Sequence, residues 1–284
     1  MSHPNEVRLL SRIAMRFCFY SEMDVRVERI KTKSQLHSVL SKRWFFDIML
    51  ENMDKKDFYL KRIGKKGKIK IWLVDGSKIR QDLDREFTNF GQHFRFPFIP
   101  KYEFWLDKEA VFNERRFFID HLLIEWQLMK NGYSYDKALR LANKKELSER
   151  KKTEDFKKII DKKGIVSVNK VHCRFLKKIN NKISIWLVRG RLVRSVLDIN
   201  FTEGGHDLVY NYIPKNEVWL DNDISAKERI YIILHELYER SLMEQGFTYS
   251  ESHKKASRIE WQSRHNKEKL RENLAQVGLT PLAG

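Results

Sequence analysis

The sequence predicts an α+β protein in which one unit, an antiparallel sheet covered by a helical hairpin, occurs twice in tandem. Two observations support this. When the 284-residue chain is shifted along itself by 114 positions, residues 71–146 align with residues 185–260 without a gap. Within each copy, short alternating apolar runs end at turn-forming residues, and two segments with helical periodicity follow. Because solenoid repeats are much shorter, a repeat of this length indicates two domain-like lobes.

An N-terminal helical extension, residues 1–56, is expected before the first copy. Apolar residues recur every three or four positions over residues 6–19 and predict one helix there. A second helix is expected over residues 35–52.

Each copy opens with a β-hairpin. In the second copy, Asn180-Asn181 separates two alternating apolar runs, and asparagine tolerates the positive φ that a two-residue hairpin turn requires. The first copy has Gly64-Lys65-Lys66-Gly67 at this point. The next strand, residues 185–188, ends at Arg189-Gly190.

A second pair of strands is expected after the hairpin. In the second copy it comprises residues 208–213 and 217–221, joined by a turn at Pro214-Lys215-Asn216. Four tryptophans occupy matching strand positions in the two copies, which favours a role in core packing over base stacking. They are Trp72, Trp105, Trp186 and Trp219.

Two helices complete each copy. In the second copy the first helix is predicted over residues 226–244 and ends before Gly246, a good C-terminal cap. The second helix is expected over residues 250–265. The resulting boundaries are 57–147 for the first repeat, 148–170 for a basic linker, 171–265 for the second repeat and 266–284 for a C-terminal tail.

The composition describes a basic, folding protein. Lys and Arg number 56 against 38 Asp and Glu, which gives a formal net charge of +18 and predicts attraction to polyanions, nucleic acid first. The two cysteines, Cys18 and Cys173, provide no disulfide framework and suit a reducing compartment. There is no signal peptide and no apolar run long enough to cross a membrane, so we expect a cytoplasmic protein without a membrane partner.

Candidate metal ligands lie in the two helices of the second repeat. His235 and Glu239 are four residues apart and share one helix face, and His253 and Glu260 are seven apart on the next helix. The turn at Gly246 could bring the two pairs together, and such a set can hold zinc, iron or manganese. His206, which follows two glycines, is a further candidate ligand or substrate contact.

His235-Glu236 on a helix resembles the start of the HExxH helix of zinc metallopeptidases. The resemblance implies that His235 is a zinc ligand and that Glu236 is the general base that activates water. It covers about five residues, and Glu239 stands where that family has its second histidine. It also implies a peptide substrate for a metal-dependent hydrolase.

The first repeat retains only part of this set. His121, Glu125 and Glu146 correspond to His235, Glu239 and Glu260. By contrast, Leu122, Leu139 and Gln92 stand at the positions of Glu236, His253 and His206. The first repeat is therefore expected to be a degenerate lobe that is retained for structure.

Two alternatives remain open. The His–Glu pairs could be buried hydrogen-bonded pairs that hold no metal. The protein could also be a non-enzymatic nucleic-acid-binding or scaffold protein of a larger assembly, which contacts phosphates through the basic residues near its last helix. Those residues are Lys254, Lys255, Arg258, Arg264 and Lys267.

Overall fold

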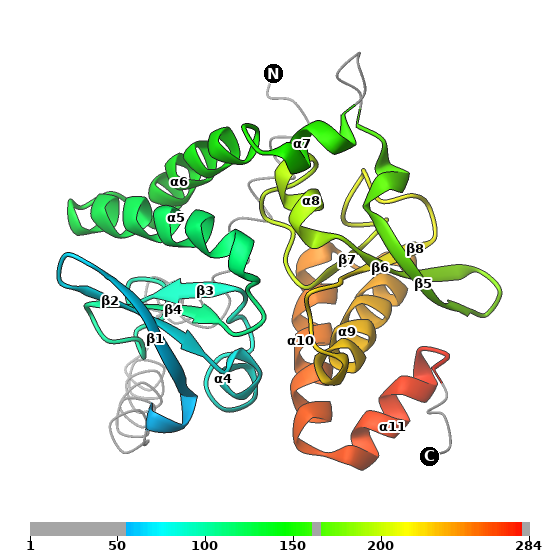
Figure 1. Ribbon diagram of the computed structural model, residues 1–284. Coiled ribbons are helices and arrows are strands. Elements are labelled where there is room, and N and C mark those ends of the chain that lie inside the picture. Colours follow the sequence, from blue (N-terminus) through cyan, green and yellow to red (C-terminus); the bar gives the residue numbers. More distant parts are fainter. Residues whose placement is uncertain (1–54, 161–165, 280–284) are drawn as a thin grey trace, which may run out of the picture. The chain divides into compact units, whose positions relative to one another are not determined.

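The computed structural model describes residues 55–160 and 166–279 (Figure 1). It contains two four-stranded sheets with the same strand order, β1-β2-β4-β3 and β5-β6-β8-β7, each packed against helices. The α+β class and the similarity of the two halves are therefore confirmed. The helices predicted over residues 6–19 and 35–52, and Cys18, lie outside the described residues.

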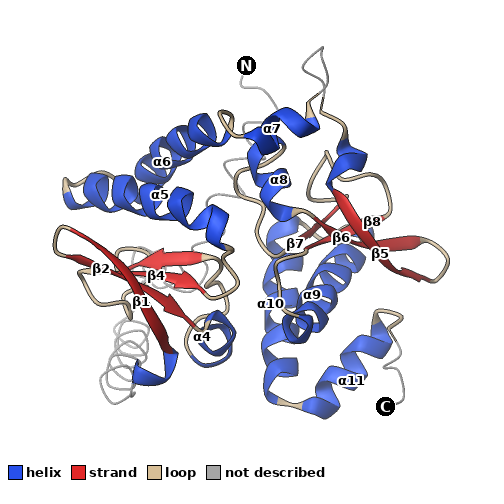
Figure 2. Ribbon diagram, viewed as in Figure 1, coloured by secondary structure: helices blue, strands red, loops and turns tan. Residues whose placement is uncertain are grey.

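Repeat 1 follows a short 3-10 helix, η1 (Lys55–Phe58). Figure 2 distinguishes its helices and strands by colour. In chain order the elements are β1 (Tyr59–Lys66), β2 (Ile69–Val74), α4 (Gly76–Asp82), β3 (Phe90–Gln92), β4 (Glu103–Asp107), α5 (Phe112–Lys130) and α6 (Tyr135–Arg150).

Repeat 2 has the same order of elements. It comprises β5 (His172–Ile179), β6 (Ile183–Val188), α8 (Gly190–Val196), β7 (Gly204–His206), β8 (Glu217–Asp221), α9 (Ala226–Glu244) and α10 (Tyr249–His265). The β5–β6 turn contains Asn180 and Asn181 with φ of 47° and 53°, as the hairpin requires. A capping box between Thr248 and Glu251 starts α10.

The sheets are mixed rather than antiparallel. β2 pairs parallel with β4, and β6 pairs parallel with β8, so that Trp186 lies beside Trp219. The chain makes this crossover through the short helices α4 and α8, which the sequence analysis did not predict. The predicted strand at residues 208–213 was wrong, because this segment forms turns and the strand that pairs with β8 is β7.

The segments on either side of repeat 2 form part of its core. Helix α7 (Glu154–Ile159) and the 3-10 helix η2 (Val168–Val171) bury Ile159 and Val171 against α8 and Trp219. Helix α11 (Lys267–Gln276) lies in the region predicted to be a tail, and it buries Leu274 among residues of β6, β8 and α9. Neither the predicted linker nor the predicted tail is therefore simply a solvated segment.

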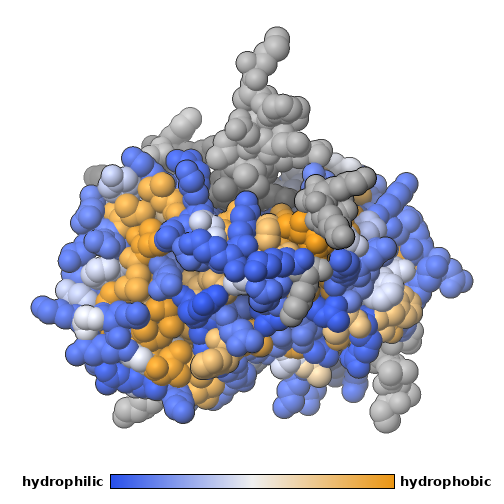
Figure 3. All heavy atoms as spheres, turned by 45° about the horizontal axis from the view of Figure 1, so that its top comes forward, coloured by the Kyte–Doolittle hydropathy of each residue, from blue (hydrophilic) through white to orange (hydrophobic). Residues whose placement is uncertain are grey.

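One helix of each hairpin covers its sheet. Helix α5 contacts β3 and β4, α9 contacts β7 and β8, and α6 and α10 pack on α5 and α9 (Figure 1). Trp105 and Trp219 are completely buried, which confirms the core role predicted for them, whereas Trp72 and Trp186 are half-buried. Hydrophilic residues cover much of the described surface in Figure 3, with hydrophobic patches between them. None of the helices in the described part of the chain is long and apolar enough to span a membrane.

The two repeats contact each other through reciprocal ion pairs. Arg80 of repeat 1 binds Glu228 of repeat 2, and Arg194 of repeat 2 binds Glu114 of repeat 1. Each arginine also binds an aspartate of its own repeat, Asp107 or Asp221. Because all these pairs are related by the 114-residue offset, the contact is of the reciprocal kind found in two-fold dimers.

Candidate metal centre

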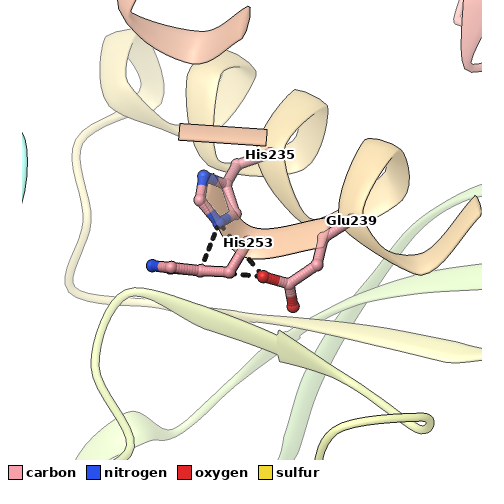
Figure 4. A group of neighbouring side chains, drawn as sticks. All are labelled: His235, Glu239 and His253. Carbon is pink, nitrogen blue, oxygen red and sulfur yellow. Dashed lines mark hydrogen bonds and ion pairs between the residues drawn. The ribbon is translucent and has the colours of Figure 1, made fainter. Parts of the chain in front are cut away.

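Three of the predicted ligands converge between α9 and α10. His253 Nδ1 lies 2.8 Å from Glu239 Oε2 and 3.2 Å from His235 Nε2 (Figure 4). His235 Nε2 is 3.6 Å from the same oxygen. Since the α9–α10 hairpin reverses the chain at Gly246, which has a φ of 92°, residues 18 positions apart can meet in this way.

The donor set and its spacing fit a divalent metal. Bonds of about 2.0–2.1 Å to a tetrahedral zinc ion place neighbouring ligand atoms roughly 3.3 Å apart. The three separations between ligand atoms, 2.8, 3.2 and 3.6 Å, lie on both sides of that value. Two imidazole nitrogens and one carboxylate leave a fourth position open, as in catalytic zinc sites, and the same set also suits iron(II).

The other ring nitrogen of His235 is held by a carboxylate. Its Nδ1 donates to Glu260 Oε2 at 2.9 Å, and Glu260 Oε1 accepts from Arg264 at 2.8 Å. Metal-binding histidines usually donate their second N–H to a carboxylate, which fixes the tautomer and the ring. Glu260 was predicted to be a ligand, but its carboxylate binds His235 Nδ1. It is not part of the triangle of ligand atoms that His235, Glu239 and His253 form.

His253 also has a carboxylate near its second nitrogen, and this one comes from repeat 1. Glu86 Oε2 lies 3.8 Å from His253 Nε2, within ion-pair distance. The Glu86 side chain is 15% exposed, so it belongs to the margin of the site. Both histidines therefore have the same kind of partner, and the site draws on both repeats.

His206 approaches Glu239 from the sheet side. Its Nε2 lies 3.0 Å from Glu239 Oε1, the oxygen that the other two histidines do not use, and the His206 side chain is completely buried. The structure thus brings His206 to the site, where it binds the second oxygen of the Glu239 carboxylate.

Glu236, the predicted base, lies next to this cluster. Its carboxylate, Glu239 and His206 offer ligand atoms within 4.8 Å of one another. Burial, together with the charge of Glu239, raises the pKa of Glu236 to about 7. Such a pKa suits a general base near neutral pH. Gly204 in β7 lies beside it, and a Cβ at this position would be 3.1 Å from Glu236 Oε1.

The three side chains of the ligand triangle shift one another's pKa values. Although burial alone would lower the pKa of His253, its hydrogen bond to Glu239 and the nearby carboxylate of Glu86 raise it to about 9. Glu239 and Glu260 likewise raise the pKa of His235 against the effect of burial. Burial would raise the pKa of Glu239, but its histidine neighbours hold it well below the usual range.

Repeat 1 retains the supporting contacts but not the triangle. His121 Nδ1 lies 2.8 Å from Glu146, as His235 lies near Glu260, and Gln92 donates to Glu125 at 2.6 Å, in the manner of His206. Buried Leu139 occupies the position of His253. The equivalent of the candidate ligand set is therefore reduced to one histidine and one carboxylate.

Apolar side chains fill the rest of this region in repeat 1. Phe90, which corresponds to Gly204, packs on Phe118 and on the ring of His121. Leu122, which corresponds to Glu236, is buried in the same cluster. The positions of Gly204 and Glu236 in repeat 2 are therefore occupied by apolar core side chains in repeat 1.

The basic residues predicted to contact nucleic acid differ in exposure. Four of them are exposed: Lys254, Lys255, Arg258 and Lys267. Arg264 does not fit this prediction, because its side chain is 3% exposed and binds Glu228 and Glu260.

Sequence reasoning missed two residues of the site, Glu86 and Gly204. Gly204 could have been found from the 114-residue offset, since a glycine replaces Phe90 beside the candidate base. Nothing local marks Glu86, because it reaches His253 from the other repeat.

Comparison of the chain with models of known protein families, with characterised proteins and with solved structures found no match in any of the three.

Proposed function

We propose that repeat 2 is a metal-dependent hydrolase site, metallopeptidase-like in its chemistry. The observation that carries the proposal is the triangle of His235, Glu239 and His253, whose spacing suits a single divalent ion, zinc first. The comparison of the repeats supports it. Repeat 1 has leucine at both positions that correspond to Glu236 and His253, although it keeps the His121–Glu146 contact.

Each side chain then has a defined task. His235, Glu239 and His253 hold the ion, which would polarise the substrate carbonyl and a bound water molecule. Glu236 is not one of the three ligands, so it is free to take a proton from that water and pass it to the leaving group. Glu260, Glu86 and His206 keep the ligands oriented.

A peptide bond is the proposed target, on the strength of the His235-Glu236 resemblance alone. The site itself favours a neutral acyl substrate, because a neutral carbonyl can bind beside the carboxylate of Glu236 without charge repulsion. Esters and amides share this chemistry with peptides.

The test is the metal content of the full-length protein, purified without a metal-affinity tag and measured by mass spectrometry. We expect one divalent ion per chain. His253→Leu, which reproduces Leu139 of repeat 1, should remove the ion. Leu139→Ala should leave it in place, because that residue lies in the repeat without the triangle.

Glu236→Gln separates metal binding from catalysis. This variant should keep the ion and lose hydrolysis of a fluorogenic casein or peptide library, since it removes a base and not a ligand. If the wild-type protein binds no zinc, iron or manganese with micromolar affinity, the proposal is contradicted. The His and Glu side chains would then be a buried hydrogen-bonded cluster that holds no metal.

A further inference from the structure

A basic cavity lies at the start of α5, and none of its lining residues belongs to the metal centre. Its volume is about 930 Å³, within the size range of small-molecule sites. Segments of both repeats and of the join between them line it: β1, α5, α7 and α8.

Cationic side chains dominate the lining. They are Lys61, Arg62, Arg115, Arg116 and Arg191, against a single carboxylate, Asp155. Asp155 binds Arg191 at 3.0 Å and so neutralises one of the five. Within the described residues, the other four form no ion pair with a carboxylate, which leaves a concentrated positive charge that faces the cavity.

Aromatic surface accompanies this charge. Phe112, at the first position of α5, is 81% exposed and lies beside Arg115, whose Cζ is 6.0 Å from the Phe112 ring centre. Among the described residues, Phe112 is the most exposed of the large hydrophobic side chains. Flat aromatic groups among cations are the features with which proteins bind single-stranded nucleic acid: the bases stack and the phosphates pair with Lys and Arg.

The equivalent position in repeat 2 lacks the aromatic ring and one of the cations. Ala226 corresponds to Phe112, and Ile230 corresponds to Arg116. Repeat 2 still has basic residues, Lys177, Lys178 and Arg229, where repeat 1 has Lys61, Arg62 and Arg115. The exposed ring of Phe112 and the charge of Arg116 are thus particular to repeat 1 and do not follow from the fold that the two copies share. Repeat 1, which lacks the ligand triangle, has a distinctive surface of its own.

From this combination we infer that the cavity at the start of α5 binds single-stranded nucleic acid, with Lys61, Arg62 and Arg116 on phosphates and Phe112 on a base. This surface is separate from the basic residues of α10, and the inference does not depend on the metal centre.

The test is fluorescence anisotropy of the full-length protein with a labelled oligothymidylate of 20 nucleotides at several NaCl concentrations. The triple variant Lys61→Ala, Arg62→Ala, Arg116→Ala should weaken binding at least tenfold. Because each lost phosphate contact lowers the salt dependence by about 0.7 for single strands, the slope of log K against log salt should fall by about 2. All three residues are exposed, so the fold should persist.

The matched control carries the same change in charge on α10: Lys254→Ala, Lys255→Ala, Arg258→Ala. It should bind almost as the wild type does. Equal losses in the two triple variants would overturn the inference, because binding would then follow net charge and not the cavity.

Phe112→Ala tests the stacking contact. It should weaken oligothymidylate binding by about tenfold and leave binding of a double-stranded oligonucleotide unchanged, since a paired base cannot stack on the ring. Tighter binding of phosphatidylserine vesicles than of oligothymidylate, lost in the cavity variant, would overturn the assignment in favour of a membrane surface. Metal content should be unchanged in every variant, which keeps the outcome separate from that of the hydrolase proposal.

Discussion

Arg80 of repeat 1 binds Glu228 of repeat 2, with Nε and Oε2 3.0 Å apart and both side chains almost completely buried. Glu228 also binds Arg264, which in turn binds Glu260, the partner of His235. A continuous chain of ion pairs therefore runs from the core of repeat 1 to the candidate metal centre. The buried charges of the two repeats are thus shared, because Glu228 is a partner of Arg80 in one repeat and of Arg264 in the other.

Glu228→Gln should destabilise the protein by about 3–5 kcal/mol, since it leaves Arg80 and Arg264 buried without their shared counter-charge. Urea denaturation at neutral pH measures this. Lys182→Ala, which removes an ion pair with Glu244 on the surface, serves as the control and should cost less than about 1 kcal/mol. A loss for Glu228→Gln no larger than that of the control would show that the reciprocal pairs do not hold the repeats together.

The duplication and the main helices were predictable because long elements carry strong local patterns. The bounds predicted for α9 agree with those observed, 226–244. The parallel strand pairs were not predictable in the same way. They depend on α4 and α8, which have seven residues each, fewer than two helical turns, so that an apolar period has almost nothing to repeat. Likewise β7, Gly204–His206, is too short and too rich in glycine to show alternation.

Glu86→Gln should weaken metal binding by about 10–100-fold, because it removes the carboxylate partner of a histidine ligand and not the ligand itself. Zinc titration by calorimetry measures the change. The control is Asn200→Ala, the equivalent position of repeat 2, where the side chain bonds Asn143 and no ligand is near. Glu86→Asp should restore part of the affinity. If Glu86→Gln binds zinc as tightly as wild type, the first repeat contributes nothing to the site.

Prediction of the site shows the same division between local and distant contacts. His235 and Glu239 were recognisable together because four residues of helix bring two side chains to one face. The pairing of His253 with them needed only the hairpin turn at Gly246. The roles of Glu260 and Glu86 depend on which ring nitrogen faces which carboxylate, and no sequence pattern encodes that choice.

Gly204→Ala should preserve the metal and reduce hydrolysis by about tenfold or more. A Cβ at this position would lie 2.8 Å from Ile232 Cγ2 and 3.1 Å from Glu236 Oε1, so the base must move while the ligands stay in place. The measurements are the metal content and kcat with the same fluorogenic substrate. Gly64→Ala is the control, since its Cβ would meet only an ordinary contact at 3.6 Å. Unchanged kcat in Gly204→Ala would argue against Glu236 as the base.

Glu203→Asn should make stability less sensitive to pH. Burial, aided by Glu260 and Glu228 and opposed by Arg80, raises the pKa of Glu203 to about 8 from an ordinary value of 4.5. The folded state therefore holds this proton more tightly than the unfolded state, so the contribution to stability is complete below about pH 4.5. It is lost as the pH rises towards 8, at about 1.4 kcal/mol for each pH unit. Asn is chosen because Asn89 occupies the equivalent position with a similar positive φ, 48° against 56°.

Urea denaturation of wild type and Glu203→Asn at pH 5 and pH 8 tests this. The variant should gain stability relative to wild type as the pH rises, because it has no carboxyl group to ionise in a buried position. Equal pH dependence in the two proteins would mean that the ion pair of Glu203 with Arg80, 2.9 Å long, compensates the burial of the charged form. Glu217→Gln, which changes a carboxyl group elsewhere in repeat 2, controls for the general effect of removing one negative charge.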